Sequence, residues 1–255
     1  MSSTYGQYCP LALAAEVLCE RWTLLVISRI VDGNRRFNEI HRGLPRMSAT
    51  LLSQRLSQLE RSGIVRRRPL ANGSGHEYVP TPAGEALETI ITDIAVWGQQ
   101  WARDMTNDDL DPGFLLWSMH LRLNTAAMPS GRTVIEFEFT GAPKDCRRFW
   151  LVNTDGVVDM CLKRPGFEID VCVRSDLRRF IEAWRGFRDL RTEIRADRIL
   201  VQGPPRLVRR FPDWLDLSMF APYSRLRAGR ENRLSLATRR REGSTVRLAT
   251  HAQDR

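Results

Sequence analysis

Residues 35–78 read RRFNEIHRGLPRMSATLLSQRLSQLERSGIVRRRPLANGSGHEY, and this stretch decides the fold of the first part of the chain. A short helix is predicted over 36–43. Ser48 then stands where an N-cap belongs, because its hydroxyl can accept a hydrogen bond from a free backbone N–H of the next turn. The second helix is predicted over 49–62, and Gly63 suits the left-handed position that ends a helix.

Two strands follow this helix, over 64–69 and 76–80. The residues between them, Asn72-Gly73-Ser74-Gly75, have the glycines that the tip of a β-hairpin needs. Two helices joined by a tight turn and followed by a hairpin form the layout of a winged helix-turn-helix. Double-stranded DNA is therefore the first partner to expect.

The positive charge of the chain is concentrated in two segments. The formal net charge over 255 residues is +9, which favours a polyanionic partner. Eleven arginines against three acidic residues give 21–68 a net charge of +8, and nine against three give 223–255 a net charge of +6. The remainder of the chain is mildly acidic, so the charge belongs to the predicted DNA-binding stretch and to the C-terminal tail.

The sequence lacks the motifs typical of secreted, membrane-spanning, disulfide-rich, metal-binding and catalytic proteins. No basic-then-apolar signal segment opens the sequence, and no run of about 18–20 apolar residues could span a membrane. The five cysteines have no C-x-x-C spacing and the four histidines are scattered, so neither a disulfide framework nor a metal site is expected. No nucleophile elbow or phosphate loop is present. We expect a cytoplasmic protein without a cofactor and without enzymatic activity.

Helices are also predicted on both sides of the winged stretch. Segments 10–20 and 22–31 have apolar residues at helical spacing. A longer helix is predicted over 82–105, about 36 Å in length, with an apolar stripe that overhangs a domain of this size. The stripe needs either the second domain or the same helix of a second subunit. The tryptophans favour the second subunit, and the predicted dimer contacts are Ile94, Trp97 and Trp101.

The composition divides the chain into four parts: a DNA-binding and dimerisation domain over 1–105, a polar linker over 106–112, a second domain over 113–222, and a tail over 223–255. The second domain is predicted to be α+β. Period-two strands are expected over 133–140, 148–155, 157–163 and 167–174, with a short last strand over 199–202. Helices are expected over 114–127, 176–187 and 206–217. The arginine-rich tail has few large apolar residues and is predicted to be disordered.

The second helix of the winged stretch has two distinct faces. At 100° per residue, Leu52, Leu56 and Leu59 share one side and are expected in the core. Bases are read by side chains near the start of such a helix, whereas later side chains meet phosphates, which position without specifying. The opposite face therefore assigns base reading to Thr50, Ser53 and Gln54, and phosphate contact to Ser57 and Arg61.

Arginines around this helix are expected to hold the DNA backbone, and those of the first wing strand to approach the minor groove. Arg55 lies at the edge of the core face, so that a structural salt bridge and a DNA contact are both open. The full set of predicted DNA-contacting residues is Arg35, Arg36, Arg46, Ser48, Thr50, Ser53, Gln54, Arg55, Ser57, Arg61, Arg66, Arg67, Arg68 and Ser74.

The first 105 residues resemble the HxlR-type branch of winged-helix regulators, which is related to the MarR type. The resemblance rests on segments in fixed order and spacing: CPL at 9–11, ERWTLL at 20–25, RFNEI at 36–40, LLSQRL at 51–56, LERSGIV at 59–65 and EY at 77–78. It implies a homodimeric transcription regulator whose N-terminal and post-wing helices dimerise. Some members use a cysteine before proline as a thiol switch, and Cys9 holds that position. A small buried residue at the dimer interface is the alternative for Cys9.

The second domain, over 114–221, resembles the sterol-carrier-protein type-two fold. The resemblance rests on FWLV at 149–152, DGVV at 155–158, IDVCV at 169–173 and DRILVQG at 197–203. It implies an apolar tunnel that holds an acyl chain or a sterol-like ligand. The expected lining residues are Phe137, Phe139, Met160, Phe180 and Trp184, which are equally suited to an ordinary core.

The combined expectation is a sequence-specific repressor that acts as a homodimer and senses an apolar small molecule through its second domain. The nearest alternative is a nonspecific architectural DNA-binding protein. A lipid or acyl-chain carrier that retains a vestigial winged helix is a further alternative, from a different class of function.

Overall fold

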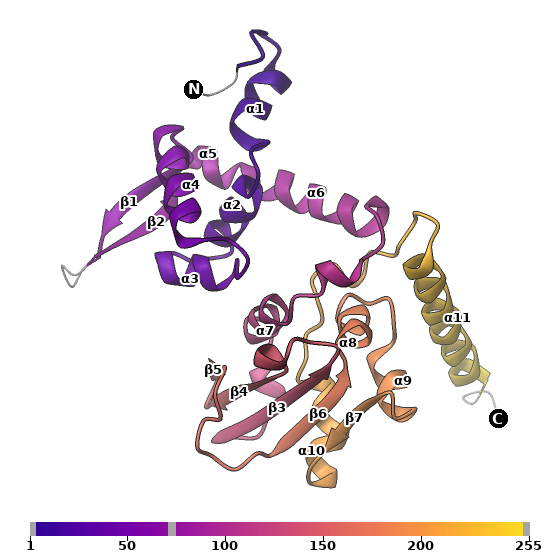
Figure 1. Ribbon diagram of the computed structural model, residues 1–255. Helices are drawn as coiled ribbons and strands as arrows, with labels where there is room; N and C mark the ends of the chain where they lie inside the picture. The colour runs from indigo at the N-terminus through magenta and orange to yellow at the C-terminus, as the bar shows by residue number, and fades with distance from the viewer. Residues whose placement is uncertain (1–3, 71–74, 252–255) are drawn as a thin grey trace. The chain divides into compact units, whose positions relative to one another are not determined.

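The computed structural model describes residues 4–70 and 75–251, with side chains up to residue 240. The chain forms two compact units that divide between Ala95 and Val96, inside helix α6 (Leu87–Trp101) (Figure 1). The structure therefore divides the chain before the linker that was predicted over 106–112.

The acidic residues of this segment belong to the second unit. Asp109, in the 3-10 helix η1 (Asn107–Asp109), accepts a hydrogen bond of 2.8 Å from the Arg103 guanidinium. Arg178 donates to the side chain of Asn107 at 2.9 Å. The polar composition predicted a linker, because composition does not reveal that Arg103, six residues away, and Arg178, 71 residues away, bind these side chains.

The first unit is a winged helix-turn-helix, as predicted. Most of its helix bounds differ from the predicted ones by one or two residues, which is usual where helix ends fray. Its elements are α1 (Pro10–Leu18), α2 (Thr23–Val31), α3 (Phe37–Arg42), α4 (Ala49–Arg61), β1 (Val65–Pro69), β2 (His76–Pro80), α5 (Pro82–Glu85) and the start of α6. Strands β1 and β2 pair in antiparallel register, with Val65 opposite Pro80.

Apolar side chains from α2, α3, α4 and the wing form the core of this unit. Val26, Ile27 and Ile30 of α2 meet the leucines of α4, and Ile40 of α3 is buried with them. Burying side chains of this size stabilises the fold by about 1.5–3 kcal/mol each. The core therefore fixes the rotation of α4 about its own axis.

The long helix predicted over 82–105 is shorter and interrupted. A turn at Ala86 separates α5 from α6, and α6 ends at Trp101. Its 15 residues span about 22 Å and not the 36 Å expected. The apolar periodicity continues past both points, which is why it did not reveal the interruption or the end.

The second unit contains one five-stranded sheet with helices, as the predicted α+β class requires. The strand order is β5-β4-β3-β6-β7, in which β3 and β6 are parallel and the other pairs antiparallel. The strands are β3 (Arg132–Thr140), β4 (Arg148–Thr154), β5 (Val157–Cys161), β6 (Val171–Asp176) and β7 (Ile199–Gln202). The helices are α7 (Pro112–His120), η2 (Thr125–Ala127), η3 (Lys144–Cys146), α8 (Leu177–Trp184), α9 (Leu190–Arg195), α10 (Pro205–Arg210), η4 (Phe211–Asp213) and α11 (Arg230–His251).

Several predicted elements of this unit need correction. The helix over 114–127 is two helices, α7 and η2, and the helix over 206–217 is α10 followed by η4. Helix α9 was not predicted. Strand β6 begins at Val171 and not at 167, because the carboxylate of Asp170 accepts the backbone N–H of Val134 at 2.8 Å. A side chain thereby takes the place of a ladder hydrogen bond.

The two faces of β3 have different roles, as their alternation predicted. Ile135, Phe137 and Phe139 are fully buried in the main core, which helices α7 and α8 complete. On the other face Val134 joins a smaller cluster with Trp150 and Val152. The indole N–H of Trp150 donates to the buried Glu136 carboxylate at 3.1 Å.

The prediction of a disordered tail over 223–255 is wrong for the residues that the structure describes. Helix α11 runs from Arg230 to His251, and the side chain of Arg225 is fully buried. Its guanidinium donates to the carbonyls of Gly98 at 3.3 Å, Gln99 at 3.0 Å and also Ala102, at the C-terminal end of α6. A cation is favoured there by the unpaired carbonyls and the helix dipole. The hydrogen bonds of Arg225 help to order the start of the tail, and the composition of the tail does not predict them.

Candidate nucleic-acid interface

Helix α4 is fixed at both ends and along one face. The Ser48 hydroxyl accepts a hydrogen bond from the backbone N–H of Leu51 at 3.3 Å. Ser48 is therefore the N-cap of α4, as predicted. Gly63 follows the helix with φ +68°, a conformation that suits glycine. Leu52, Leu56 and Leu59 are buried. The side of α4 that faces outward is therefore determined by the core.

The outward side of α4 contains the predicted DNA-reading residues. All of them are exposed: Thr50, Ser53, Gln54, Ser57 and Arg61. Among the residues that the structure describes, the Gln54 side chain has no hydrogen-bond partner, so both N–H groups and the carbonyl of its amide are open to a base edge. Hydroxyl and amide groups with this freedom can read bases in the major groove.

Helix α3 makes hydrogen bonds to the segments on both of its sides, the turn before α4 and the residues that precede α3. His41 Nε2 lies 2.7 Å from the carbonyl oxygen of Met47. The Glu39 carboxylate accepts the backbone N–H groups of Arg35 and Arg36, each at 3.0 Å. The Glu39 bonds fix the start of α3, and the His41 contact fixes the turn between α3 and α4, which a helix-turn-helix needs to place its second helix in a groove.

The predicted arginines divide into engaged and free groups. Arg55 donates to the carbonyl of Arg21 at 3.0 Å and pairs with Glu20, so the structure favours its structural role. Arg68 pairs with Glu77 across the wing at 2.7 Å, and Arg36 lies 4.0 Å from Glu39.

Arg61, Arg66 and Arg67 are exposed, and no ion pair engages them in the described part of the chain. Arg35 is half-buried and Arg46 is exposed. Since cross-strand partners share a face, Arg67 lies on the side of Tyr78, and Arg66 on the side of Val79. Predicted residue Ser74 lies outside the described residues.

A contact that the sequence did not predict joins the end of α4 to the helix after the wing. The Thr81 hydroxyl donates to the carbonyl of Gly63 at 2.6 Å, and its backbone N–H donates to that of Ile64 at 3.0 Å. Thr81 is also the N-cap of α5, where its hydroxyl accepts the backbone N–H of Gly84 at 3.3 Å. The order threonine–proline after a strand signals the cap, but no local pattern signals the bond to Gly63.

Comparison with known proteins assigns this unit. Residues 17–106 match the HxlR-like helix-turn-helix family. The HTH-type transcriptional regulator YvaP of Bacillus subtilis is 34% identical over 112 residues, which are 43% of this chain and 96% of that protein. The chain belongs to the HxlR-like family.

A second relative and a solved structure are similar to the same part of the chain. The HTH-type transcriptional regulator YodB of Bacillus subtilis is 34% identical over 95 residues, 36% of this chain and 85% of that protein. The solved structure of reduced YodB is 31% identical and covers 39% of this chain and all of that one, with a TM-score of 0.35. Each match covers less than half of this chain.

Helix α6, which lies within the residues matched to the HxlR-like family, has an exposed apolar stripe. Ile90, Ile94, Trp97 and Trp101 are spaced at helical intervals, and Trp97 is 61% exposed. Three of these four are the predicted dimer contacts. Cys9 is an exposed free thiol directly before α1, so its burial would require a partner; its redox role stays a prediction.

The predicted ligand-lining residues of the second unit lie in a close-packed cluster. The ring centroids of Phe139 and Phe180 are 5.0 Å apart, those of Phe137 and Phe180 5.9 Å, and all three rings are at most 1% exposed. Trp184 is buried in the same core, and Met160 packs against it. These contacts show core packing and do not outline an opening.

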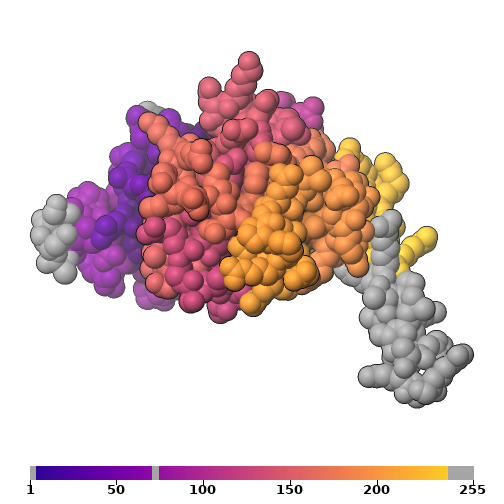
Figure 2. All heavy atoms as spheres, turned by 90° about the horizontal axis from the view of Figure 1, so that it is seen from below, coloured from indigo at the N-terminus to yellow at the C-terminus, as the bar shows by residue number. Residues whose placement is uncertain are grey.

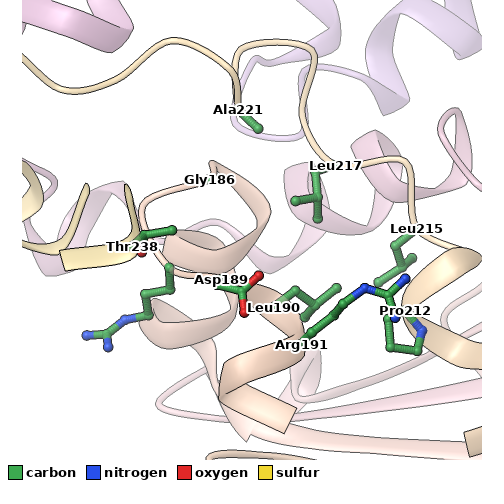
Figure 3. A pocket seen from close by; sticks show the side chains of 10 residues that line it. Gly186, Asp189, Leu190, Arg191, Pro212, Leu215, Leu217, Ala221 and Thr238 are labelled. Carbon is green, nitrogen blue, oxygen red and sulfur yellow. The ribbon is translucent and has the colours of Figure 1, made fainter. Parts of the chain in front are cut away.

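A cavity of about 250 Å³ lies elsewhere in this unit (Figure 3). Leu190 of α9 and Leu217 approach it from opposite sides. Its lining is half apolar and half polar: Gly186, Arg188, Asp189, Leu190, Arg191, Pro212, Leu215, Leu217, Ala221 and Thr238.

Among the described helices, none combines the length and the apolar character that a membrane span requires.

Proposed function

We propose that this protein is a homodimeric repressor that reads its operator with Thr50, Ser53 and Gln54 of α4. The observation that supports this function is the exposed polar side of α4, which the buried leucines orient outward. Family membership supports the same function, because the relatives are HTH-type transcriptional regulators.

Discrimination between DNA sequences tests this function directly. Affinity is measured for the DNA upstream of the protein's own gene and for a scrambled duplex, at several salt concentrations. We expect a preference for the upstream DNA that persists as salt weakens both complexes. A ratio near one at every salt concentration would contradict the proposal and favour an architectural DNA-binding protein.

Substitution of Gln54 locates the reading residues. Gln54→Ala should weaken upstream binding by about 1–3 kcal/mol and leave scrambled binding unchanged, because an amide contact to adenine specifies sequence. Glu60→Ala is the matched control on the same helix, since Glu60 is exposed and lies outside the predicted reading residues. Equal losses in the two variants would remove Gln54 from the reading face.

The apolar stripe of α6 supports the homodimer. Four large apolar side chains exposed along one helix need a partner, and a two-fold copy provides an identical surface. Two recognition helices related by a two-fold axis also match the two half-sites of a palindromic operator.

The cavity lined by Leu190, Leu215 and Leu217 is our candidate effector site. Its 250 Å³ lies just below the ~300–1,000 Å³ usual for ligand sites, so we propose a small compound with apolar and polar groups and not a sterol. Such a ligand can act only if it binds two states of the dimer with different affinity. Native mass spectrometry of the purified protein should show the dimer together with any retained ligand.

A further inference from the structure

Helix α11 is attached to the second unit along one side. The buried Glu231 carboxylate accepts the backbone N–H of Met105 at 2.8 Å, and the Thr238 hydroxyl donates to the carbonyl of Phe187 at 3.0 Å. Ser235, which lies one turn after Glu231 and before Thr238 in the sequence, is also buried. The helix therefore has a defined inner face.

The outer face of α11 is basic. At 100° per residue, Arg233 and Arg240 lie on the side opposite Glu231 and Thr238. Both are exposed, as is Arg239, and Figure 2 shows the first turns of α11, coloured yellow, at the surface of the second unit. No acidic side chain pairs with these three arginines within the described residues.

Two neighbouring arginines, Arg225 and Arg230, are neutralised. Arg230 pairs with Glu182 at 3.0 Å, and the buried Arg225 lies 3.5 Å from Asp104. Among the described side chains of α11, the arginines without an ion pair are therefore Arg233 and Arg240 on the outer face and Arg239 on its flank.

Given the proposed regulatory function, we propose that Arg233, Arg239 and Arg240 form a second DNA contact that binds phosphates without reading sequence. Phosphate binding needs only exposed cations, and each neutralised phosphate releases condensed counterions. A membrane-binding helix would need an apolar face toward the lipid, but the inner face of α11 is attached to its own unit. A protein interface would need a buried apolar centre, and Leu236 is the only large apolar side chain exposed among 230–240.

Truncation cannot test this contact cleanly. A chain ending at Pro222 would lose Arg233, Arg239 and Arg240, but also Arg225, which binds the last carbonyls of α6. A loss of affinity would then report a damaged helix end as well as lost charge. Substitution in the full chain avoids this.

The test is the triple variant Arg233→Gln, Arg239→Gln and Arg240→Gln, measured on a scrambled duplex of about 40 base pairs. The matched control is Arg206→Gln, Arg209→Gln and Arg210→Gln on α10, which removes the same charge from three other exposed arginines of this unit. The slope of log K against log salt concentration should fall by up to about 2.7 in the α11 variant and by less than one in the control.

Equal slopes in the two variants would overturn the proposal, because they would show an effect of net charge alone. An unchanged slope in the α11 variant would overturn it too, even if binding to vesicles containing phosphatidylserine were lost. Since the duplex is scrambled, this outcome does not depend on the operator preference that tests the proposed function.

Discussion

Two arginines of α4 show how position along one helix decides a side chain's role. The Arg55 side chain is 14% exposed, and it binds the carbonyl of Arg21 and the carboxylate of Glu20. Arg61 lies six residues later on the outward side and has no ion pair in the described residues. The first connects α4 to the start of α2, and the second is available for phosphate.

Substituting these two arginines should separate stability from DNA binding. Arg55→Ala should lower the free energy of unfolding by about 1–2 kcal/mol, because it leaves the Arg21 carbonyl and Glu20 without a partner. Arg61→Ala should leave the melting temperature unchanged and reduce the salt slope of DNA binding by about 0.9. Thermal unfolding and salt titrations of both variants test this. A lower melting temperature for Arg61→Ala would contradict the division.

Residue roles that depend on local pattern were predictable, and those that depend on distant partners were not. Ser48 was predicted as a cap because a cap acts on its own helix. The outward side of α4 followed from helical periodicity. The burial of Arg225 was not predictable, since its acceptors Gly98, Gln99 and Ala102 lie more than 120 residues earlier.

The junction between the wing and α5 depends on a close approach of two backbones. A Cβ atom at Gly84 would lie 2.3 Å from the carbonyl oxygen of Ile64, well inside contact distance. Thr81 donates to the same carbonyl. Helix α5 therefore packs directly on the backbone of Ile64, which follows α4 and Gly63.

Alanine substitutions at two glycines should have opposite effects on stability. Gly84→Ala should destabilise the protein by about 1–3 kcal/mol, because backbone must move to admit the methyl group. Gly98→Ala, in the interior of α6, meets nothing within 4 Å and should stabilise by about 0.5–1 kcal/mol. Chemical denaturation of each variant measures both effects. Similar changes in the two would show that the approach at Gly84 is not limiting.

A buried carboxylate joins three elements of the second unit. Burial alone would raise the pKa of Glu193, but hydrogen bonds from Arg198 and Arg179, with the charge of Arg188, lower it to about 2. The Arg179 guanidinium comes from α8 at 2.7 Å, and Arg198 lies directly before β7. The ionised form of Glu193 thus holds α8, α9 and the start of β7 together.

The low pKa of Glu193 predicts an acid-sensitive second unit. An unfolded chain takes up this proton near the ordinary 4.5, whereas the folded chain does so only near 2. The ionised Glu193 therefore contributes roughly 3 kcal/mol to the free energy of unfolding above pH 4.5, and this contribution is lost as the pH falls toward 2. Thermal unfolding from pH 2 to 6 should show this slope. Glu193→Gln should flatten it, and Glu168→Gln, at an exposed position, should not.

At the level of elements, periodicity predicted the strands of the sheet and the helices of the winged unit. It did not predict the interruption at Ala86, because the apolar stripe continues through it. It also missed α9, a helix of six residues whose start depends on the Asp189 cap. Short helices have too few turns to show a period.

The proposed dimer of the whole molecule forms through the exposed stripe of α6. Trp97→Glu should convert the proposed dimer to a monomer and weaken operator binding, because it places a charge in an apolar contact. Leu162→Glu is the matched control, since Leu162 is 69% exposed and lies directly after β5. Native mass spectrometry gives the subunit number of each variant. A dimeric Trp97→Glu protein, or a monomeric wild type, would contradict this assembly.

The capping of α6 by Arg225 also constrains how the protein is made. Arg225 follows Ala102 by 123 residues. At a synthesis rate of about 5–20 residues per second, this separation corresponds to a delay on the order of ten seconds. The ribosome therefore releases the DNA-reading unit well before the guanidinium that completes α6. A chain terminated before residue 225 would carry a finished helix-turn-helix joined to a helix whose last carbonyls have lost their partner.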